Sequence, residues 1–242
     1  MWFSAVVPVA VAAAVSAAMP VFAQDWGPMT NTEDGFRAAY PGRPAVETIR
    51  YSTEFHLTLP ARVYRASDPL GRYSTTVVDY RDVERLHNER AAACRAAKGA
   101  NQKDGDTCQN DFALEVIGAM DHAMSGYLRR DGAKITHYGT YFVEQVSGRL
   151  LHLTNADRSR TNVAVHQHGG RLYIQEATVP ADMPEPILFM ESLAWVNQDG
   201  LGIRYRQPYT EGYGAWKFPP QQPPFTLRDL DTSIDQPARP PR

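Results

Sequence analysis

The sequence is poor in cysteine and lysine, it has no large excess of either charge, and its one apolar run of near-membrane length stands at the N-terminus. Two cysteines and four lysines occur among 242 residues, and 25 basic against 27 acidic side chains give a net charge of −2. This balance excludes a basic nucleic-acid binder and a disordered polyelectrolyte at the level of the whole chain. With 43% apolar and 21% charged residues, the composition is that of an ordinary globular protein.

The first 23 residues contain no charged side chain, and positions 5–18 are almost entirely alanine and valine. Small residues follow up to Ala23, just before Gln24. This pattern is typical of a secretory signal peptide over residues 1–23, although no Lys or Arg precedes the apolar run. A misassigned start and an uncleaved anchor are the alternatives. We expect cleavage, a periplasmic or secreted bacterial protein, and no membrane span after cleavage.

Cys94 and Cys108 are the two cysteines, and a closely spaced even pair in an exported protein predicts a disulfide. A reactive or metal-binding thiol pair is the alternative, but there is no CxxC motif and no histidine lies between the two. The chain-entropy model gives about 3 kcal/mol for closing a loop of about this length. The predicted bridge joins the end of one helix to the start of the next.

The residue pattern predicts one α+β domain. A helix is expected over residues 82–98, which lack Gly and Pro, and another over 112–130, where apolar residues recur every three or four positions. A third is expected over 187–196, with Asp182 as its cap. Strands are expected at residues 36–40, 46–57, 61–65 and 73–80, in a meander over 135–179, and at 203–206. The expected architecture is an antiparallel sheet of meander strands, with a disulfide-stapled helical hairpin and a third helix packed on it.

The domain is expected to occupy residues 35–207, after a lead-in at 24–34. Residues 208–242 hold 8 of the 18 prolines and few aliphatic residues after Phe218. Such a segment buries too little apolar surface to order itself, so we expect an extended or disordered tail. The apolar stripe of the second helix is expected to face the sheet with Phe112, Val116, Ile117, Met120, Met124, Tyr127 and Leu128.

The meander is expected to turn at residues 147–148, 155–158 and 169–170. Gly169-Gly170 gives the clearest signal, because two glycines supply the positive φ angles of a two-residue hairpin turn. This turn places His168 opposite Arg171 and His166 opposite Tyr173, and opposed residues share a face. We expect this histidine face, which also holds Gln175, to be the wetter one. The other face is assigned to the core and carries Val163, Val165, Leu172 and Ile174.

Several short motifs carry a resemblance that runs from residue 35 to residue 205. They are Gly35-Phe36, Tyr40-Pro41-Gly42-Arg43-Pro44, Leu59-Pro60-Ala61-Arg62-Val63-Tyr64, Thr76-Val77-Val78-Asp79-Tyr80, Gly170-Arg171-Leu172-Tyr173, and Phe189 with Ser192-Leu193. The chain is similar to small exported bacterial proteins of unknown function and, more loosely, to the PsbP-like α+β fold. The resemblance implies an antiparallel sheet covered by helices and a role as an assembly or accessory module. It carries over no functional residue, and the helical hairpin departs from the family plan.

Three pairs of residues have spacings that metal sites use. His166 and His168 lie on one face of a strand, but Arg171 stands opposite and no third ligand is adjacent in sequence. Glu84 with His87, and Glu115 with His122, each share a helix face, a weak match to di-metal helical bundles. A solvated charged face on each helix is the preferred interpretation, since exposed Glu and His are the rule. We therefore expect no metal and no cofactor.

No catalytic motif assembles a nucleophile, a base and an oxyanion site, because G-x-S-x-G, GxxxxGK[ST] and GxGxxG are all missing. The aromatic residues Tyr209, Tyr213 and Trp216 either pack against the sheet or form a binding strip. The leading hypothesis is an exported, non-enzymatic accessory or interaction module whose partner is another periplasmic or envelope protein and not a nucleic acid. One alternative is a metal-dependent or hydrolytic periplasmic enzyme with a dispersed site, such as His166, His168, Glu84 and His87. Another is a small-ligand carrier, which a large apolar cavity beneath the helical hairpin would support.

Overall fold

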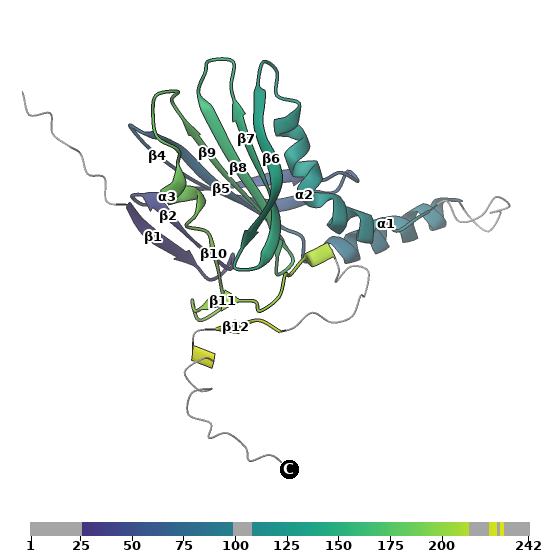
Figure 1. The fold of residues 1–242 in the computed structure, drawn as a ribbon. Coiled ribbons are helices and arrows are strands. Elements are labelled where there is room, and N and C mark those ends of the chain that lie inside the picture. Colours follow the sequence, from purple (N-terminus) through teal and green to yellow (C-terminus); the bar gives the residue numbers. More distant parts are fainter. Residues whose placement is uncertain (1–25, 99–107, 213–222, 227, 230–242) are drawn as a thin grey trace, which may run out of the picture.

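Two antiparallel sheets and three helices make up the computed structural model, which describes residues 26–98, 108–212, 223–226 and 228–229 (Figure 1). The smaller sheet has the strand order β1 (Trp26–Asn31), β2 (Phe36–Pro41), β10 (Ala194–Val196), β11 (Gly202–Arg204) and β12 (Phe225–Thr226). The larger has the order β3 (Ala45–Ser52), β4 (Thr58–Asp68), β5 (Gly71–Asp79), β9 (Arg171–Val179), β8 (Arg160–His168), β7 (Val146–Thr154) and β6 (Lys134–Val143). The helices are α1 (Val83–Lys98), α2 (Phe112–Leu128) and α3 (Ile187–Met190). The α+β fold is therefore confirmed.

The hairpin between β8 and β9 has the register that its two glycines predict. Gly169 and Gly170 have φ angles of 60° and 69°, and His168 lies opposite Arg171. The β4–β5 hairpin also has a tight turn. Asp68 Oδ1 accepts hydrogen bonds from the backbone N–H groups of Leu70 and Gly71, each at 2.9 Å. Local turn chemistry thus fixes the register of these two hairpins.

The expected turn at residues 147–148 is wrong. The chain turns instead at Glu144 and Gln145, whose φ angles are 47° and 69°, and Gly148 lies inside β7 opposite His166. A side chain at position 148 would run into the imidazole of His166 and the backbone of Val165. Glycine is needed there for close packing and not for a turn.

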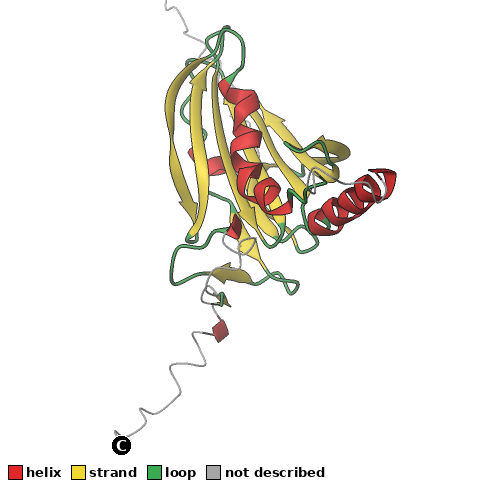
Figure 2. Ribbon diagram, turned by 90° about the vertical axis from the view of Figure 1, so that its right-hand side faces the viewer, coloured by secondary structure: helices red, strands yellow, loops and turns green. Residues whose placement is uncertain are grey.

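The helix α2 covers one face of the larger sheet, as Figure 2 shows. The buried residues of α2 are Glu115, Val116, Ala119, Met120, Ala123 and Met124. The apolar ones pack against sheet residues that include Leu151, Val163, Val165 and Leu172. Ile117 and Leu128, which were expected in this stripe, are each 37% exposed, because small Ala119 and Ala123 take the positions nearest the sheet.

The opposite face of the larger sheet, expected to be the wetter one, is buried. The smaller sheet covers it, and the second core between them includes Phe36, Tyr40, Tyr64, Tyr73, Tyr173, Phe189 and Trp195. His166 is 0% exposed there and His168 is 6% exposed. The prediction failed because the covering strands β1, β2 and β10 come from segments far from the meander in sequence.

The third helix is much shorter than expected. The structure has one turn, α3, followed by strand β10 where residues 194–196 were expected to be helical. Trp195 pairs with Phe36 of β2, and its indole Nε1–H donates to the carbonyl of Val143 at 3.0 Å. Asp182 does not cap α3, whose N-cap position is Pro186. Tertiary pairing has overridden the local helical pattern.

Both ends of the described chain add strands to the smaller sheet. β1 lies in the expected lead-in and pairs with β2, so the sheet begins before residue 35. β12 lies in the expected tail and pairs with β11. The predicted signal peptide and most of the predicted tail lie outside the described residues. Among the residues that the structure describes, no helix is both long and apolar enough to cross a membrane.

Candidate functional site

The two cysteines form the predicted disulfide, which links Cys94 in the last part of α1 to Cys108 ahead of α2, with 5.7 Å between their Cα atoms. The Arg95 guanidinium donates a hydrogen bond to the carbonyl of Cys108 at 3.2 Å. The buried residues of α1 are Val83, His87 and Ala91, and the part of the helix after them projects away from the sheet (Figure 1). The bridge thus ties the projecting part of α1 to the chain just ahead of α2, which packs on the sheet.

His166 and His168 lie in the second core among aromatic rings. The His168 ring stacks on Trp195 with 4.7 Å between centroids, and its Nε2 lies 2.9 Å from the hydroxyl of Tyr205. His166 meets Tyr141 and Trp195 edge-to-face, and neither of its ring nitrogens has a hydrogen-bond partner among the residues that the structure describes. Burial lowers the pKa of His166 to about 3 and that of His168 to about 4. Both imidazoles are therefore neutral at pH 7.

On the other side of the sheet, the structure brings together one residue from each candidate helix pair. Glu115 is fully buried, and its Oε2 accepts a hydrogen bond from Thr53 at 2.9 Å and lies 3.3 Å from His87 Nε2. The expected solvated faces are therefore wrong for Glu115 and His87, because the β3–β4 turn and the packing of α1 on α2 enclose them. Their sequence partners stay outside: Glu84 is exposed, and His122 Nε2 lies 3.1 Å from the Ser52 carbonyl.

The dispersed set His166, His168, Glu84 and His87 does not converge. The first two lie between the sheets and the last two lie on the side of the helices. In the described ranges, no group of three or more His, Cys, Asp or Glu is placed to hold a metal ion.

The described part of the aromatic tail packs against the body. Tyr209 stacks on Tyr205 at 4.5 Å between centroids, and its hydroxyl donates to Glu211 at 2.6 Å. Its backbone forms hydrogen bonds with Gln145 and Ser147 at the β6–β7 turn. Tyr213 and Trp216 lie outside the described residues.

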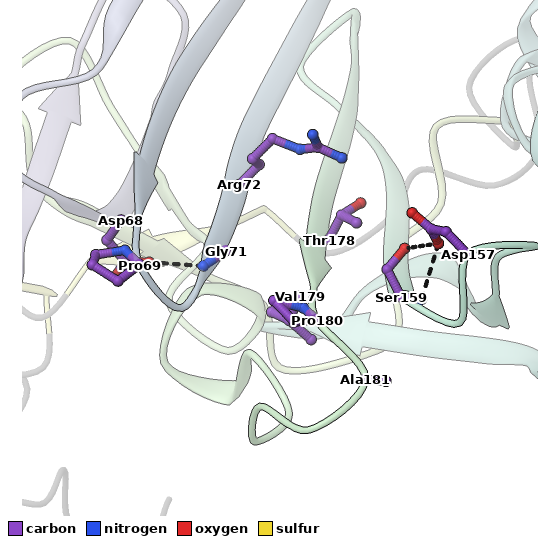
Figure 3. Close-up of a pocket in the computed structure, with 10 residues that line it drawn as sticks. All are labelled: Asp68, Pro69, Gly71, Arg72, Asp157, Ser159, Thr178, Val179, Pro180 and Ala181. Atoms are coloured by element: carbon purple, nitrogen blue, oxygen red, sulfur yellow. Dashed lines mark hydrogen bonds between the residues drawn. The ribbon is translucent and has the colours of Figure 1, made fainter.

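A group of cavities lies at the open end of the larger sheet, beyond the C-terminal end of α2. One has a volume of about 400 Å³ and lies between the β4–β5 turn and the loop that holds Asp157 and Ser159 (Figure 3). Two others, of about 510 and 480 Å³, share Arg72 and Thr178 with it. We call this region the Arg72 trough, and its floor is formed by Arg65, Arg72, Ser74, Glu176 and Thr178.

Sequence reasoning missed this trough, although the strands carry a signal for it. On the helix side of β9, Leu172 and Ile174 belong to the core, whereas Glu176 and Thr178 further along the same face line the cavities. Arg72 lies directly opposite Thr178 in the ladder, so their side chains share this face. A strand face that changes from apolar to polar at mid-length indicates where a covering helix ends.

Two acidic groups that line the trough, Glu176 and Asp157, are engaged by neighbours. Glu176 accepts a hydrogen bond from the Tyr127 hydroxyl at 2.8 Å and lies 3.5 Å from Arg130 Nη2. Asp157 accepts hydrogen bonds from the side chain and the backbone N–H of Ser159, and these bonds, with the nearby Arg72 charge, lower the pKa of Asp157.

The basic groups differ from one another. Arg65 pairs with Glu47, and Arg130 donates to Asn155 at 3.1 Å. Arg72 is exposed and, within the part of the chain that the structure describes, its guanidinium makes no hydrogen bond or ion pair. Arg72 is therefore the charged side chain of the trough with all its donors free.

No protein-family model and no curated protein matches this chain. Among solved structures, the chain is similar to the solution structure of cyanobacterial PsbP (CyanoP) from Synechocystis sp. PCC 6803. The TM-score is 0.41 and the sequence identity is 10%, over 75% of this chain and 98% of that chain.

Proposed function

We propose that this protein is an exported, non-enzymatic interaction module that binds its partner in the Arg72 trough. The observation that carries the proposal is a set of adjoining open cavities on a sheet that share Arg72, whose guanidinium makes no hydrogen bond or ion pair within the described ranges. Binding sites are concave and have a few polar groups that fix the orientation of the ligand.

The surroundings of Arg72 favour holding a ligand over transforming one. Thr178 Oγ1 is hydrogen-bonded to Thr161 at 2.8 Å, and Asn155 donates to Thr161 at 2.9 Å. The Ser159 hydroxyl donates to Asp157 at 2.6 Å. These bonds fix the side chains on the sheet and its adjoining loop, so little conformational entropy is lost when a partner binds.

Export is supported by the disulfide between Cys94 and Cys108, because such bonds persist in oxidising compartments. The apolar stretch at positions 5–18 supports the same compartment. The proposed partner is therefore another periplasmic or envelope protein. Mass spectrometry of the protein recovered from the periplasm tests this part, because a purely cytoplasmic protein with two free thiols would contradict it.

Site-directed photo-crosslinking in the source cells tests the binding site. Benzoylphenylalanine is placed at Pro69, on the exposed rim of the trough, and for comparison at Leu188, an exposed position on α3. We expect a discrete adduct from position 69 that is lost when Ser74→Trp fills the floor, and no such adduct from position 188. Absence of the adduct at position 69, or equal adducts at both positions, would overturn the proposal.

A further inference from the structure

The chemistry of the Arg72 trough also indicates what it binds, an inference that rests on the proposed function. Four acidic side chains line the cavities of the trough; Asp157, Glu176 and Asp68 are held by local bonds, and Asp131 is exposed. Asp157 is held by Ser159 and Glu176 by Tyr127. Asp68 accepts hydrogen bonds from the backbone of its own turn and from the Tyr73 hydroxyl at 3.2 Å. None of them forms an ion pair with Arg72 among the described residues.

The charges of Asp157 and Arg72 interact, yet the two side chains form no hydrogen bond or ion pair among the described residues. The loop that holds Asp157 is closed by the Asn155 backbone N–H, which donates to the Ser159 carbonyl at 2.8 Å, and by the bonds from Ser159 to Asp157. The Arg72 guanidinium therefore keeps its positive charge and its five N–H donors, arranged in a planar fork, available to a ligand.

Two residues with hydroxyl side chains share the face of the sheet that carries Arg72. Thr178 lies directly opposite Arg72 on β9, and Ser74 follows Arg72 two positions along β5. A guanidinium fork matches the oxygen spacing of a carboxylate or a phosphate and binds either in a bidentate manner. We propose that the Arg72 trough binds an oxyanion, a carboxylate or phosphate group, through the Arg72 fork with a hydroxyl of the trough as a further donor.

Titrations followed by NMR test this proposal with two defined probes, inorganic phosphate and an acetylated, amidated diglutamate peptide, at low ionic strength. The Arg72 Nε–Hε signal is assigned by its loss in Arg72→Lys. We expect a saturable shift of this signal and of the Thr178 amide. Arg72→Gln should weaken binding by about tenfold or more, the size expected for a charge-assisted hydrogen bond. Arg72→Lys should weaken it less, because it keeps the charge but loses the fork.

Arg50→Gln is the matched control, since Arg50 is exposed on β3 of the same sheet and has no ion pair among the described residues. This variant should bind as the unchanged protein does. Saturation by phosphate alone indicates a free phosphate-type ligand, and saturation by the peptide indicates an acidic partner segment; both support the proposal. No saturable shift at Arg72 with either probe, or equal binding by Arg72→Gln, would overturn it.

The two proposals can fail separately. If the adduct at position 69 persists in Arg72→Gln and neither probe shifts the Arg72 signal, the trough binds a partner without oxyanion recognition. If the probes bind and no adduct forms at position 69, the oxyanion site is supported and the proposed binding of a partner in the trough is contradicted.

Discussion

The two faces of the larger sheet are both buried, but by different kinds of cover and different side chains. Under α2 the core is mainly aliphatic, with Met124, Leu151 and Leu172 among its fully buried members. Under the smaller sheet the core is aromatic and contains Tyr40, Tyr173 and Trp195. The larger sheet is thus covered on one face by a helix and on the other by a second sheet.

The difference follows from what each cover presents. A helix inserts a ridge of side chains, and α2 uses small alanines so that its backbone can approach. A sheet presents a broad face about 10 Å away, which large flat rings fill. Each buried ring with a polar tip then needs a partner, and Tyr40 donates to Thr75 at 2.6 Å while Tyr173 donates to the Asp34 carbonyl at 2.7 Å.

The largest effect is expected from removing the ring at the centre of the aromatic face. Trp195→Ala should lower the free energy of unfolding by about 3–5 kcal/mol, since it leaves a cavity beside His168 and Tyr173 and removes the bond to Val143. Trp195→Phe keeps most of the packing and should cost about 1–2 kcal/mol. Urea denaturation followed by circular dichroism measures both, and equal losses would show that the ring is not central to this core.

On the aliphatic face, the second prediction concerns Glu115, whose carboxylate is fully buried. Glu115→Leu should destabilise the protein by about 2 kcal/mol, because Thr53 and His87 lose their partner. The double variant with His87→Leu should recover much of that loss, since an apolar pair replaces a polar one. A double-mutant cycle from urea denaturation gives the coupling, and strictly additive losses would show that the two side chains do not interact.

These elements also show where sequence reasoning succeeds. The glycine pair at 169–170 gave the correct β8–β9 register, and residue spacing gave α1, α2 and the disulfide. Each of these signals is local. The burial of His166 is not, because β1 and β10 stand on either side of the meander in sequence and cover it only after long-range pairing.

The buried His87–Glu115 contact and the Arg72 trough were missed for the same reason, because both depend on long-range packing. The contact between His87 and Glu115 spans 28 residues and exists only once α1 packs on α2. The Arg72 trough depends on where α2 stops relative to strands β5 and β9. The sequence shows that β5 and β9 each have a polar end. It does not show how much of the sheet α2 leaves uncovered.

The aromatic face should also make the protein sensitive to acid. Burial lowers the pKa values of His166 and His168 to about 3 and 4, whereas an unfolded histidine titrates near about 6.5. The unfolded state therefore binds more protons below that value. Stability should fall as the pH drops from about 6.5 toward 4, by up to about 1.4 kcal/mol per pH unit for each histidine.

His166→Phe tests the origin of this slope. It keeps a flat ring and removes one titrating group, so the slope of unfolding free energy against pH between about 6 and 4 should fall by up to one histidine's share, about 1.4 kcal/mol per pH unit. Trp195→Phe is the control, because it weakens the same core without removing a titrating group. An unchanged slope in His166→Phe would place the acid sensitivity elsewhere.

The smallest effect is expected at the turn that assigns residues to the two faces. Gly169 has a φ of 60°, and a Cβ there would meet only the Arg171 guanidinium, at 3.8 Å. Gly169→Ala should therefore cost about 1 kcal/mol from backbone strain alone. Gly169→Asn should cost less, because asparagine tolerates this conformation. Urea denaturation compares the two variants, and a stability unchanged by alanine would contradict the left-handed turn.

The register should stay unchanged in both variants, because a slip of one residue would exchange the aliphatic and aromatic faces. Cross-strand nuclear Overhauser effects between His168 and Arg171 measure whether their pairing survives.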